Sequence, residues 1–344
     1  MPEQPRDLLP GAPDDAANRF VEENLVEGQP IAGPQLWGTA VGLGPEGRRR
    51  GKGLGFAAWL AIGWMVFVVG IAVLSQLGVL PVGSPTDVVA SCARKGPFAN
   101  EGTAPGYLLG CDSNGRDMVA RLAYGSWSSL VVSTGAVAFG FLIGGFFGLV
   151  AGYIGGKFDT VITGAFNVLL SIPAIVLALA LVAFLQASTK GVSGNDGGFF
   201  HDPKVILILA IGVVSVPLLG RITRASALSW SQREFVLAAK AQGAKTGRIM
   251  VREVLPNVLP AMFSIALLGI AVAIVAEGTL AILGVGVKPP TPSWGNIIAQ
   301  ERGNLNDSPH MVFEPAILIF LTVLALNYLG DVVRARLDVR EAGI

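Results

Sequence analysis

The chain has 344 residues, of which 52% are hydrophobic and only 14% are charged, against about 25% charged residues in soluble domains. This balance indicates a protein whose solvent is lipid and argues against an ordinary soluble domain. The formal net charge of +1 creates no field that would favour nucleic acid, and the Cys and His residues do not cluster at metal-ligand spacing.

Residues 1–54 are rich in Pro, Gly, Asp and Glu and lack apolar periodicity. They end in a basic cluster, Arg48 to Lys52. Such a composition predicts a disordered tail. It does not indicate a signal peptide, because the first apolar run begins too late in the sequence.

Six apolar runs follow the tail, and together they predict an all-α membrane protein with about six transmembrane helices. Phe56–Leu80 has 25 residues without a charge, more than the roughly 20 that a bilayer requires. Val205–Gly220 has only 16, and we expect the flanking Lys204 and Arg221 side chains to extend to the interface. The other runs are Ser128–Gly156, Thr160–Ala187, Asn257–Val287 and Pro315–Gly330.

The distribution of Lys and Arg predicts the orientation. Of the 25 cations, 17 fall on the tail, the second-to-third and fourth-to-fifth connections and the C-terminus. The positive-inside rule then places both termini in the cytoplasm. The expected divisions are a tail at 1–54, a first helix at 55–81, an extracytoplasmic loop at 82–127 and a transmembrane domain at 128–344.

Cys92 and Cys111 both fall in the first extracytoplasmic loop. An oxidising exterior permits a disulfide bond between them, which would staple the loop. Two free thiols are the alternative.

The cytoplasmic connection at 221–256 has its own helical pattern. Ser231 and Glu234 have the spacing of a capping box, which predicts that a helix begins at Ser231. Gly243 supplies a position where that helix can end. A second helical stretch, Ile249–Leu255, leads to Pro256 at the start of the fifth membrane helix.

One aromatic and two small side chains, Phe235, Ala238 and Ala239, would share a face of the first short helix. Such a face suits docking into the groove of a partner protein. An amphipathic helix lying on lipid headgroups is the alternative, and physical chemistry alone does not separate the two.

The stretch from Glu234 to Ala244, followed by Leu255, Pro256 and Asn257, resembles the EAA loop of bacterial ABC importer permeases. In that family the loop forms coupling helices that lie in a cleft on the ATPase subunit. Ala238, Ala239 and Gly243 match the motif, whereas Leu237 and Glu253 depart from it. The resemblance implies that the coupling residues are Glu234, Phe235, Ala238, Ala239, Gly243 and Pro256.

Two further blocks resemble the dipeptide, oligopeptide and nickel branch, and within it the second, C-type permease. One runs from Leu109 to Gly125 and contains Cys111 and Ala120 in place of the usual Thr and Ser. The other runs from Leu283 to Gly295. The first lies on a connection that the cation count places outside the cytoplasm, and the second runs from the end of the fifth span into another such connection.

This resemblance implies a permease subunit of a binding-protein-dependent importer of short peptides in the cytoplasmic membrane. The implied partners are a paralogous permease chain, two ABC ATPase subunits or domains, an extracytoplasmic binding protein and membrane lipid. ATP and Mg²⁺ would be bound by the ATPase chains, and no cofactor is expected here.

The motifs that are absent point away from an enzyme. The chain has no P-loop, no His-Glu-x-x-His zinc motif and no Gly-x-Ser-x-Gly nucleophile elbow. A permease for nickel or another small solute is one alternative. A self-sufficient channel or secondary transporter is another, although such proteins usually carry several ionisable groups at membrane depth.

Three residues within the spans are candidates for the translocation pathway. Glu277 places a carboxyl group inside the fifth span, where it either lines the pathway or forms a packed, hydrogen-bonded group. Pro173 and Pro217 interrupt backbone hydrogen bonds and can kink a helix beside a cavity, although packing alone would also account for them.

The extracytoplasmic connections hold another group of candidates. Asp112, Arg116 and Asp117 either pair with one another inside the loop or contact the binding protein. Trp294 is expected in the aromatic belt at the membrane interface, with a role in binding-protein contact as a suggestion. Gly144, Gly145 and Gly148 form a small-residue face that predicts close helix packing.

Overall fold

The computed structural model describes residues 54–97, 107–189 and 202–341, and Leu54 onward forms one structural unit. The predicted disordered tail at 1–54 falls almost wholly outside the described residues. Within them the secondary structure is helical, and β-pairing is limited to two isolated bridges, Val88 with Arg116 and Cys111 with Asp117.

Apolar composition sets the positions of the long helices. The helices of the described part are α2 (Phe56–Gln76), α3 (Met118–Ile154), α4 (Gly156–Ser171), α5 (Ala174–Thr189), α6 (Pro203–Ser231), α7 (Glu234–Ala241), α8 (Thr246–Ile249), α9 (Leu255–Ile282), α10 (Trp294–Glu301) and α11 (His310–Glu341). Two 3₁₀ turns, η2 (Ala90–Cys92) and η5 (Arg302–Asn304), and one π turn, η4 (Met250–Val254), complete the described elements.

Five continuous helical segments in the described part are long and apolar enough to cross a membrane. A sixth span forms if α4 and α5, which meet at a bend of 91°, count as one broken span. The prediction of an all-α membrane protein with about six spans is therefore confirmed. Large apolar side chains such as Phe146, Phe184 and Phe320 are more than half exposed, as expected for side chains that face lipid.

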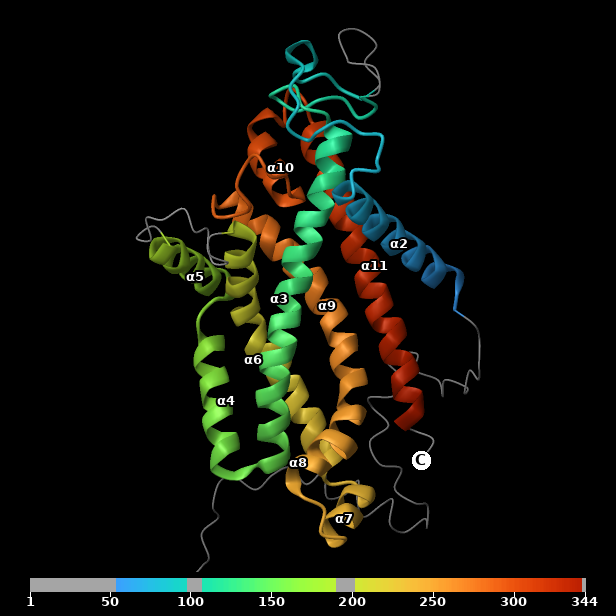
Figure 1. Cartoon of the computed structure of the whole chain (residues 1–344), viewed down its shortest axis with the longest axis vertical. Coiled ribbons are helices and arrows are strands. Elements are labelled where there is room, and N and C mark those ends of the chain that lie inside the picture. Colours follow the sequence, from blue (N-terminus) through green and yellow to red (C-terminus); the bar gives the residue numbers. More distant parts are fainter. Residues whose placement is uncertain (1–53, 98–106, 190–201, 342–344) are drawn as a thin grey trace, which may run out of the picture. The chain divides into compact units, whose positions relative to one another are not determined.

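The third apolar run does not form the single helix that its composition predicts. Ile172 has extended backbone angles (φ −89°, ψ 130°), and the chain turns sharply there. The residue before a proline is disfavoured in the helical region because the proline ring clashes with it. Pro173 therefore divides the run into α4 and α5, which Figure 1 shows running in different directions.

Glycine allows α3 and α6 to pack with their backbones in close contact. Four glycines of α3, Gly140, Gly144, Gly148 and Gly152, recur at every fourth residue. A Cβ atom at Gly144 would lie 2.3 Å from the carbonyl oxygen of Val216, and one at Gly148 would lie 2.2 Å from that of Gly220. This α3–α6 seam contains two of the three glycines of the predicted small-residue face, Gly144 and Gly148, whereas Gly145 faces Met262 of α9. It allows the close approach that membrane helices use to associate.

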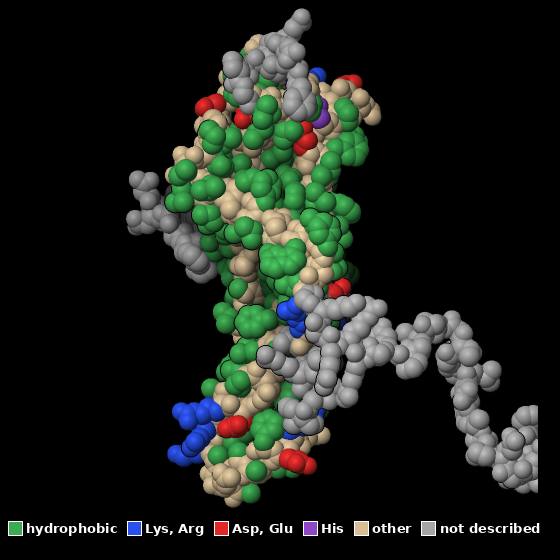
Figure 2. Space-filling view, turned by 90° about the vertical axis from the view of Figure 1, so that its right-hand side faces the viewer, with side chains coloured by type: hydrophobic (Ala, Val, Ile, Leu, Met, Phe, Trp, Pro, Cys, Tyr) green, Lys and Arg blue, Asp and Glu red, His purple; other side chains and the backbone are tan. Residues whose placement is uncertain are grey.

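The two ends of the bundle carry different structures. Figure 1 places α7 and α8 at one end, and α10 with the connection between α2 and α3 at the other. Figure 2 shows apolar side chains across the middle of one face, with Lys and Arg side chains nearer the α7 end. This arrangement agrees with the division of connections between two sides of a membrane that the cation count predicts.

Candidate functional site

The segment that joins α6 to α9 forms a projection at one end of the bundle. Helix α6 continues to Ser231, beyond the predicted end of its span at Gly220, and so takes up the first part of this segment. The one separate helix of more than one turn in the segment is α7. On the other side α8, the π turn η4 and α9 form one continuous span from Thr246 to Ile282. The segment therefore contains one free-standing helix where the sequence predicted two.

The π turn explains how the second predicted helix merges with the span. Pro256 lies in the first turn of α9, directly after η4. A proline ring would clash with the carbonyl group four residues earlier in a regular helix, and the wider π turn accommodates it.

The predicted capping box does not form. Ser231 is the last residue of α6, and its hydroxyl donates a hydrogen bond to the Leu228 carbonyl oxygen (2.8 Å). Helix α7 begins at Glu234 with Arg233 as its N-cap and without a side-chain cap. The error arises because α6 continues through Ser231, so Arg233 and not Ser231 directly precedes the first turn of α7.

The predicted end of the helix is correct. Gly243 has φ +80°, in the left-handed region, and its amide donates to the Lys240 carbonyl oxygen (3.0 Å). The amide of Ala244 donates to the Ala239 carbonyl oxygen (3.1 Å). These two bonds form a Schellman motif, which closes α7 and redirects the chain toward α8.

One side of α7 is anchored to the bundle. Val236 is fully buried in an apolar cluster with Leu149 of α3, Ile249 of α8 and Val258 of α9. The Lys240 ammonium group lies 5.1 Å from the ring centroid of Tyr153 in α3. Apolar burial and a cation–π contact together fix the orientation of the helix.

The opposite side of α7 is exposed and carries small and apolar side chains beside the carboxylate of Glu234. Leu237 is 53% exposed, and Ala238 and Ala241 are also exposed. Ala239 instead packs partly against the buried cluster. The structure therefore places Leu237 on the outward face with Ala238, a role that the motif comparison missed because it treated Leu237 as a departure.

Glu277 lies at a junction of three helices. Its side chain is fully buried and accepts hydrogen bonds from the hydroxyl groups of Ser293 (2.7 Å) and Ser129 (3.2 Å). Ser129 in turn accepts from the backbone amide of Trp294 (3.1 Å). The carboxyl group thus joins α9 to α3 and to the first turn of α10, and these bonds compensate for its burial.

The two prolines predicted to kink their spans behave differently. Pro173 lies at the bend between α4 and α5. Pro217 is buried inside α6, which continues through it as one helix. A role in the pathway for either residue stays a prediction.

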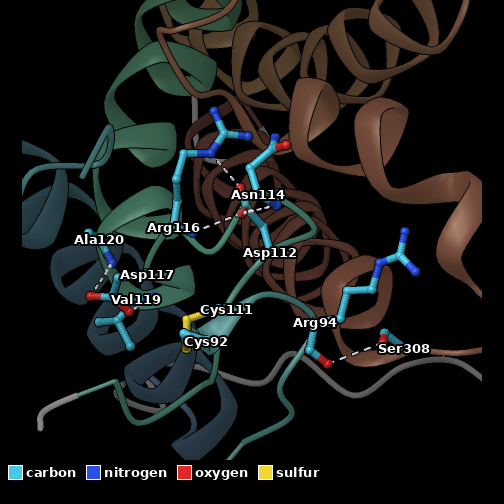
Figure 3. The surroundings of a disulfide bond; sticks show 10 residues. All are labelled: Cys92, Arg94, Cys111, Asp112, Asn114, Arg116, Asp117, Val119, Ala120 and Ser308. Carbon is cyan, nitrogen blue, oxygen red and sulfur yellow. Dashed lines mark hydrogen bonds and ion pairs between the residues drawn. A yellow bond between two sulfur atoms is a disulfide. The ribbon is translucent and has the colours of Figure 1, made fainter. Parts of the chain in front are cut away.

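The connection at the other end of the bundle folds into a small cap, which we define as residues 88–97 and 107–117. Backbone hydrogen bonds join its two segments. The amide of Arg94 donates to the Asp112 carbonyl oxygen (3.0 Å), and the amide of Val89 donates to that of Gly115 (2.9 Å). A disulfide bond joins Cys92 to Cys111, both fully buried, with their Cα atoms 5.8 Å apart (Figure 3).

Asp112 is the centre of an ionic cluster under the cap. Its carboxylate accepts from Arg116 Nε (2.6 Å) and from Arg121 Nη1 (2.5 Å), and all three side chains are almost fully buried. It also accepts from the backbone amides of Asn114 and Arg116 (both 2.9 Å), as Figure 3 shows. The pairing that the sequence suggested for Asp112 and Arg116 is therefore present.

Asp117 has a separate task, because it caps α3. Its carboxylate accepts from the amides of Val119 (3.0 Å) and Ala120 (3.3 Å). Burial raises the pKa of this carboxyl group, and the two amide hydrogen bonds act in the opposite direction.

The ionic cluster also reaches α10. Arg116 and Arg121 both donate to Gln300 Oε1 (3.1 and 3.2 Å), and Ser113 donates to Glu301 (3.0 Å). These partners could not be predicted from the sequence, because Arg121 and Gln300 are 179 residues apart and no local pattern connects them.

Trp294 is not in an interfacial belt. Its side chain is 1% exposed, and the indole N–H donates to the Leu122 carbonyl oxygen (3.2 Å). The prediction failed because Ser293 begins a helix here: its hydroxyl accepts from the Asn296 amide (3.1 Å) and turns Trp294 into the protein. Within the described residues no group of three or more Cys, His, Asp or Glu side chains is arranged to hold a metal ion.

Comparison with known proteins gives a consistent result. Residues 144–342 match the family model described as binding-protein-dependent transport system inner membrane component. The dipeptide transport permease DppC of Alkalihalophilus pseudofirmus is 34% identical over 79% of this chain and 84% of its own length. The glutathione transport permease GsiD of Pectobacterium atrosepticum is 33% identical over 70% of this chain and 74% of its own length.

A solved structure supports the fold. The methionine ABC transporter MetNI, in an inward-facing conformation, contains a chain with a TM-score of 0.51 and 22% sequence identity. The match covers 63% of this chain and 97% of that one. With the helical spans and the projecting α7, these matches show that the chain belongs to the inner-membrane permease family of binding-protein-dependent ABC transport systems.

Proposed function

We propose that this chain is one of two permease subunits in an importer of short peptides, and that α7 transmits movement from an ATPase subunit to the membrane helices. The observation that carries the proposal is the exposed apolar face of an otherwise anchored helix. The peptide cargo rests on relatives named as dipeptide, di/tripeptide and glutathione transport permeases, which are 33–34% identical to this chain.

The outward face of α7 suits a groove on another protein. Leu237 and Ala238 are exposed on a helix that is too short to be stable alone, so its surroundings must hold it in place. A small apolar helix face of this kind is the usual partner of a hydrophobic groove. We infer that the groove belongs to an ABC ATPase subunit, which supplies ATP, Mg²⁺ and the hydrolytic chemistry.

The inward face connects that groove to the spans. Val236 packs in one cluster with residues of α3, α6, α8 and α9, so a displacement of α7 would move the ends of three long helices together. The α3–α6 seam would carry this displacement as one rigid pair. Rigid-body motion of packed helices is a common way to switch between two states.

Further assignments follow from this arrangement. Both termini and α7 would lie in the cytoplasm, and a second, paralogous permease would complete the pathway. Glu277, Pro173 and Pro217 would act near that pathway, with Glu277 holding α10 against α9. An extracytoplasmic binding protein would dock on the cap and on α10, whose shape is set by Asp112, Arg116, Asp117 and Trp294.

A charge on the outward face of α7 tests the coupling role. Leu237→Glu should reduce peptide-stimulated ATP hydrolysis by the reconstituted transporter at least tenfold while leaving insertion and thermal stability unchanged, since exposed substitutions usually alter stability by about 0.5 kcal/mol or less. Asn306→Glu adds the same charge at an exposed site at the other end of the bundle and should leave hydrolysis unchanged. Equal activity of the two variants would remove the docking assignment.

Uptake by the same proteoliposomes tests the cargo. A peptide importer should accumulate a labelled dipeptide only when ATP is enclosed with the ATPase subunits. Accumulation of nickel without dipeptide would favour the small-solute alternative. Dipeptide movement without ATPase subunits would favour a self-sufficient channel or secondary transporter.

A further inference from the structure

A cavity of about 340 Å³ lies beside the cap, away from α7. Its walls come from α2, α3, α10, α11 and the end of the cap. Most of the side chains in these walls are apolar, and Glu314 is the one charged side chain among them. The lining residues are Phe67, Val68, Ile71, Leu109, Val119, Leu122, Ala123, Ser126, Trp294, Glu314, Ile317 and Leu318.

Glu314 lacks a partner inside the described part of the chain. Both of its carboxyl oxygens are buried, and neither has a hydrogen bond there. The other polar groups of the wall are already satisfied, because Ser126 donates to the Ala123 carbonyl oxygen (2.6 Å) and the Trp294 indole to that of Leu122. A buried carboxyl group without a hydrogen bond destabilises the folded protein. A ligand in the cavity that donates a hydrogen bond to Glu314 would remove this cost.

The cavity opens toward the surface that faces lipid. Phe67 of α2 and Ile317 of α11 line it, and each is 53% exposed. Glu314 is four residues from the start of α11, a depth of about 6 Å along the helix at 1.5 Å per residue. The carboxyl group therefore lies near the polar boundary of the membrane, with apolar walls extending further inward.

His310 supplies a second unsatisfied group. It lies one helical turn before Glu314, so the two side chains share a face of α11. Its Nε2 atom is buried and also lacks a partner in the part of the chain that the structure describes. His310 is not among the residues that line the cavity, so Glu314 is the charged group that the cavity presents to a ligand.

We propose that this cavity binds a phospholipid with a primary amine headgroup. The ammonium group would donate to Glu314, the phosphate would lie at the polar boundary, and a hydrocarbon chain would fill the apolar cavity. A quaternary amine would bind less well because it has no N–H group to donate. This lipid site is independent of the peptide cargo and of the coupling role of α7.

The test uses the full-length chain, purified with the subunits that accompany it. Native mass spectrometry would measure retention of added phosphatidylethanolamine, phosphatidylcholine and phosphatidylglycerol. The wild type should retain phosphatidylethanolamine about tenfold better than the other two, as one charge-assisted hydrogen bond would provide. Glu314→Gln, which preserves the shape, should abolish this preference.

Two matched variants separate charge from packing. Asp331→Asn removes an exposed carboxylate from the same helix and should keep the preference. Ala123→Leu fills the cavity and should lower the retention of all three lipids while Glu314 remains.

Several results would overturn the proposal. An unchanged preference in Glu314→Gln would do so. Binding of a short peptide in lipid-free detergent, lost in Glu314→Gln, would assign the carboxyl group to a peptide amine instead. Loss of an accompanying subunit from that variant, without a change in lipid retention, would place a cation of a partner chain in the cavity.

Discussion

Different interactions stabilise the two ends of this molecule. At one end, α7 is held by an apolar cluster around Val236 and leaves Leu237 and Ala238 exposed. At the other end, the cap is closed by the Cys92–Cys111 disulfide and the buried charges around Asp112. Apolar packing is non-directional, whereas a disulfide and a charged network fix one geometry.

This difference suggests different tasks for the two ends. A helix held by apolar contacts can shift with its neighbours and still keep its outward face intact. A stapled cap with internal ion pairs keeps its shape while the helices beneath it move.

Removal of the central carboxylate of the cap should be the most damaging change. Asp112→Ala leaves Arg116 and Arg121 buried without their main partner, which should cost about 3–5 kcal/mol of stability. Thermal unfolding in detergent would measure the loss. Asp87→Ala removes an exposed carboxylate from the same connection and should have little effect. Similar unfolding temperatures for the two variants would contradict the role assigned to the ion cluster.

Loss of the disulfide should have a smaller effect on the same end. Replacing both Cys92 and Cys111 by Ser opens a link across a sequence separation of 19, which should cost about 3 kcal/mol. Reductant should destabilise the wild type but not the double variant. Mass spectrometry without reductant provides an independent check, and free thiols at both positions would show that the cap folds without the bond.

The smallest effect should come from the turn that ends α7. Gly243→Ala places a Cβ atom at φ +80°, where nothing lies within 4 Å, so only the left-handed backbone is penalised, by about 1 kcal/mol. Gly247→Ala, in equally open space but without a positive φ, is the matched control and should be slightly stabilising, because Ala favours a helix more than Gly does. Peptide-stimulated ATP hydrolysis should fall more in Gly243→Ala, because the orientation of α7 depends on that turn.

The sequence predicted well those features that depend on local composition. Apolar runs located the spans, and Gly243 located the end of α7, because both signals lie within a few residues. The seam between α3 and α6 was visible in part, since small residues recur at helical spacing. The apolar run alone predicted one continuous span, because it continues on both sides of Pro173. The proline itself marked the position of the kink, and the 91° bend lies there.

Features that depend on distant residues escaped prediction. The partners of Arg121 are Asp112 and residues of α10, far away in the sequence. Because Arg121 is charged, the apolar run was predicted to begin after it, at Ser128, whereas α3 begins ten residues earlier, at Met118. The prediction of an interfacial position for Trp294 is wrong because the burial of this side chain depends on contacts with α3, which the local sequence does not reveal. Ser231 had the correct spacing for a capping box, but the end of α6 determines its actual bond.

The account depends most on the identity of the protein that contacts α7. A photo-crosslinking amino acid at Leu237, in the complete transporter purified from its membrane, tests that contact directly, with Asn306 as the control position. We predict that position 237 crosslinks to an ATPase subunit and that position 306 does not. Crosslinking of position 237 only to lipid, or to a protein on the side of the cap, would contradict the coupling role.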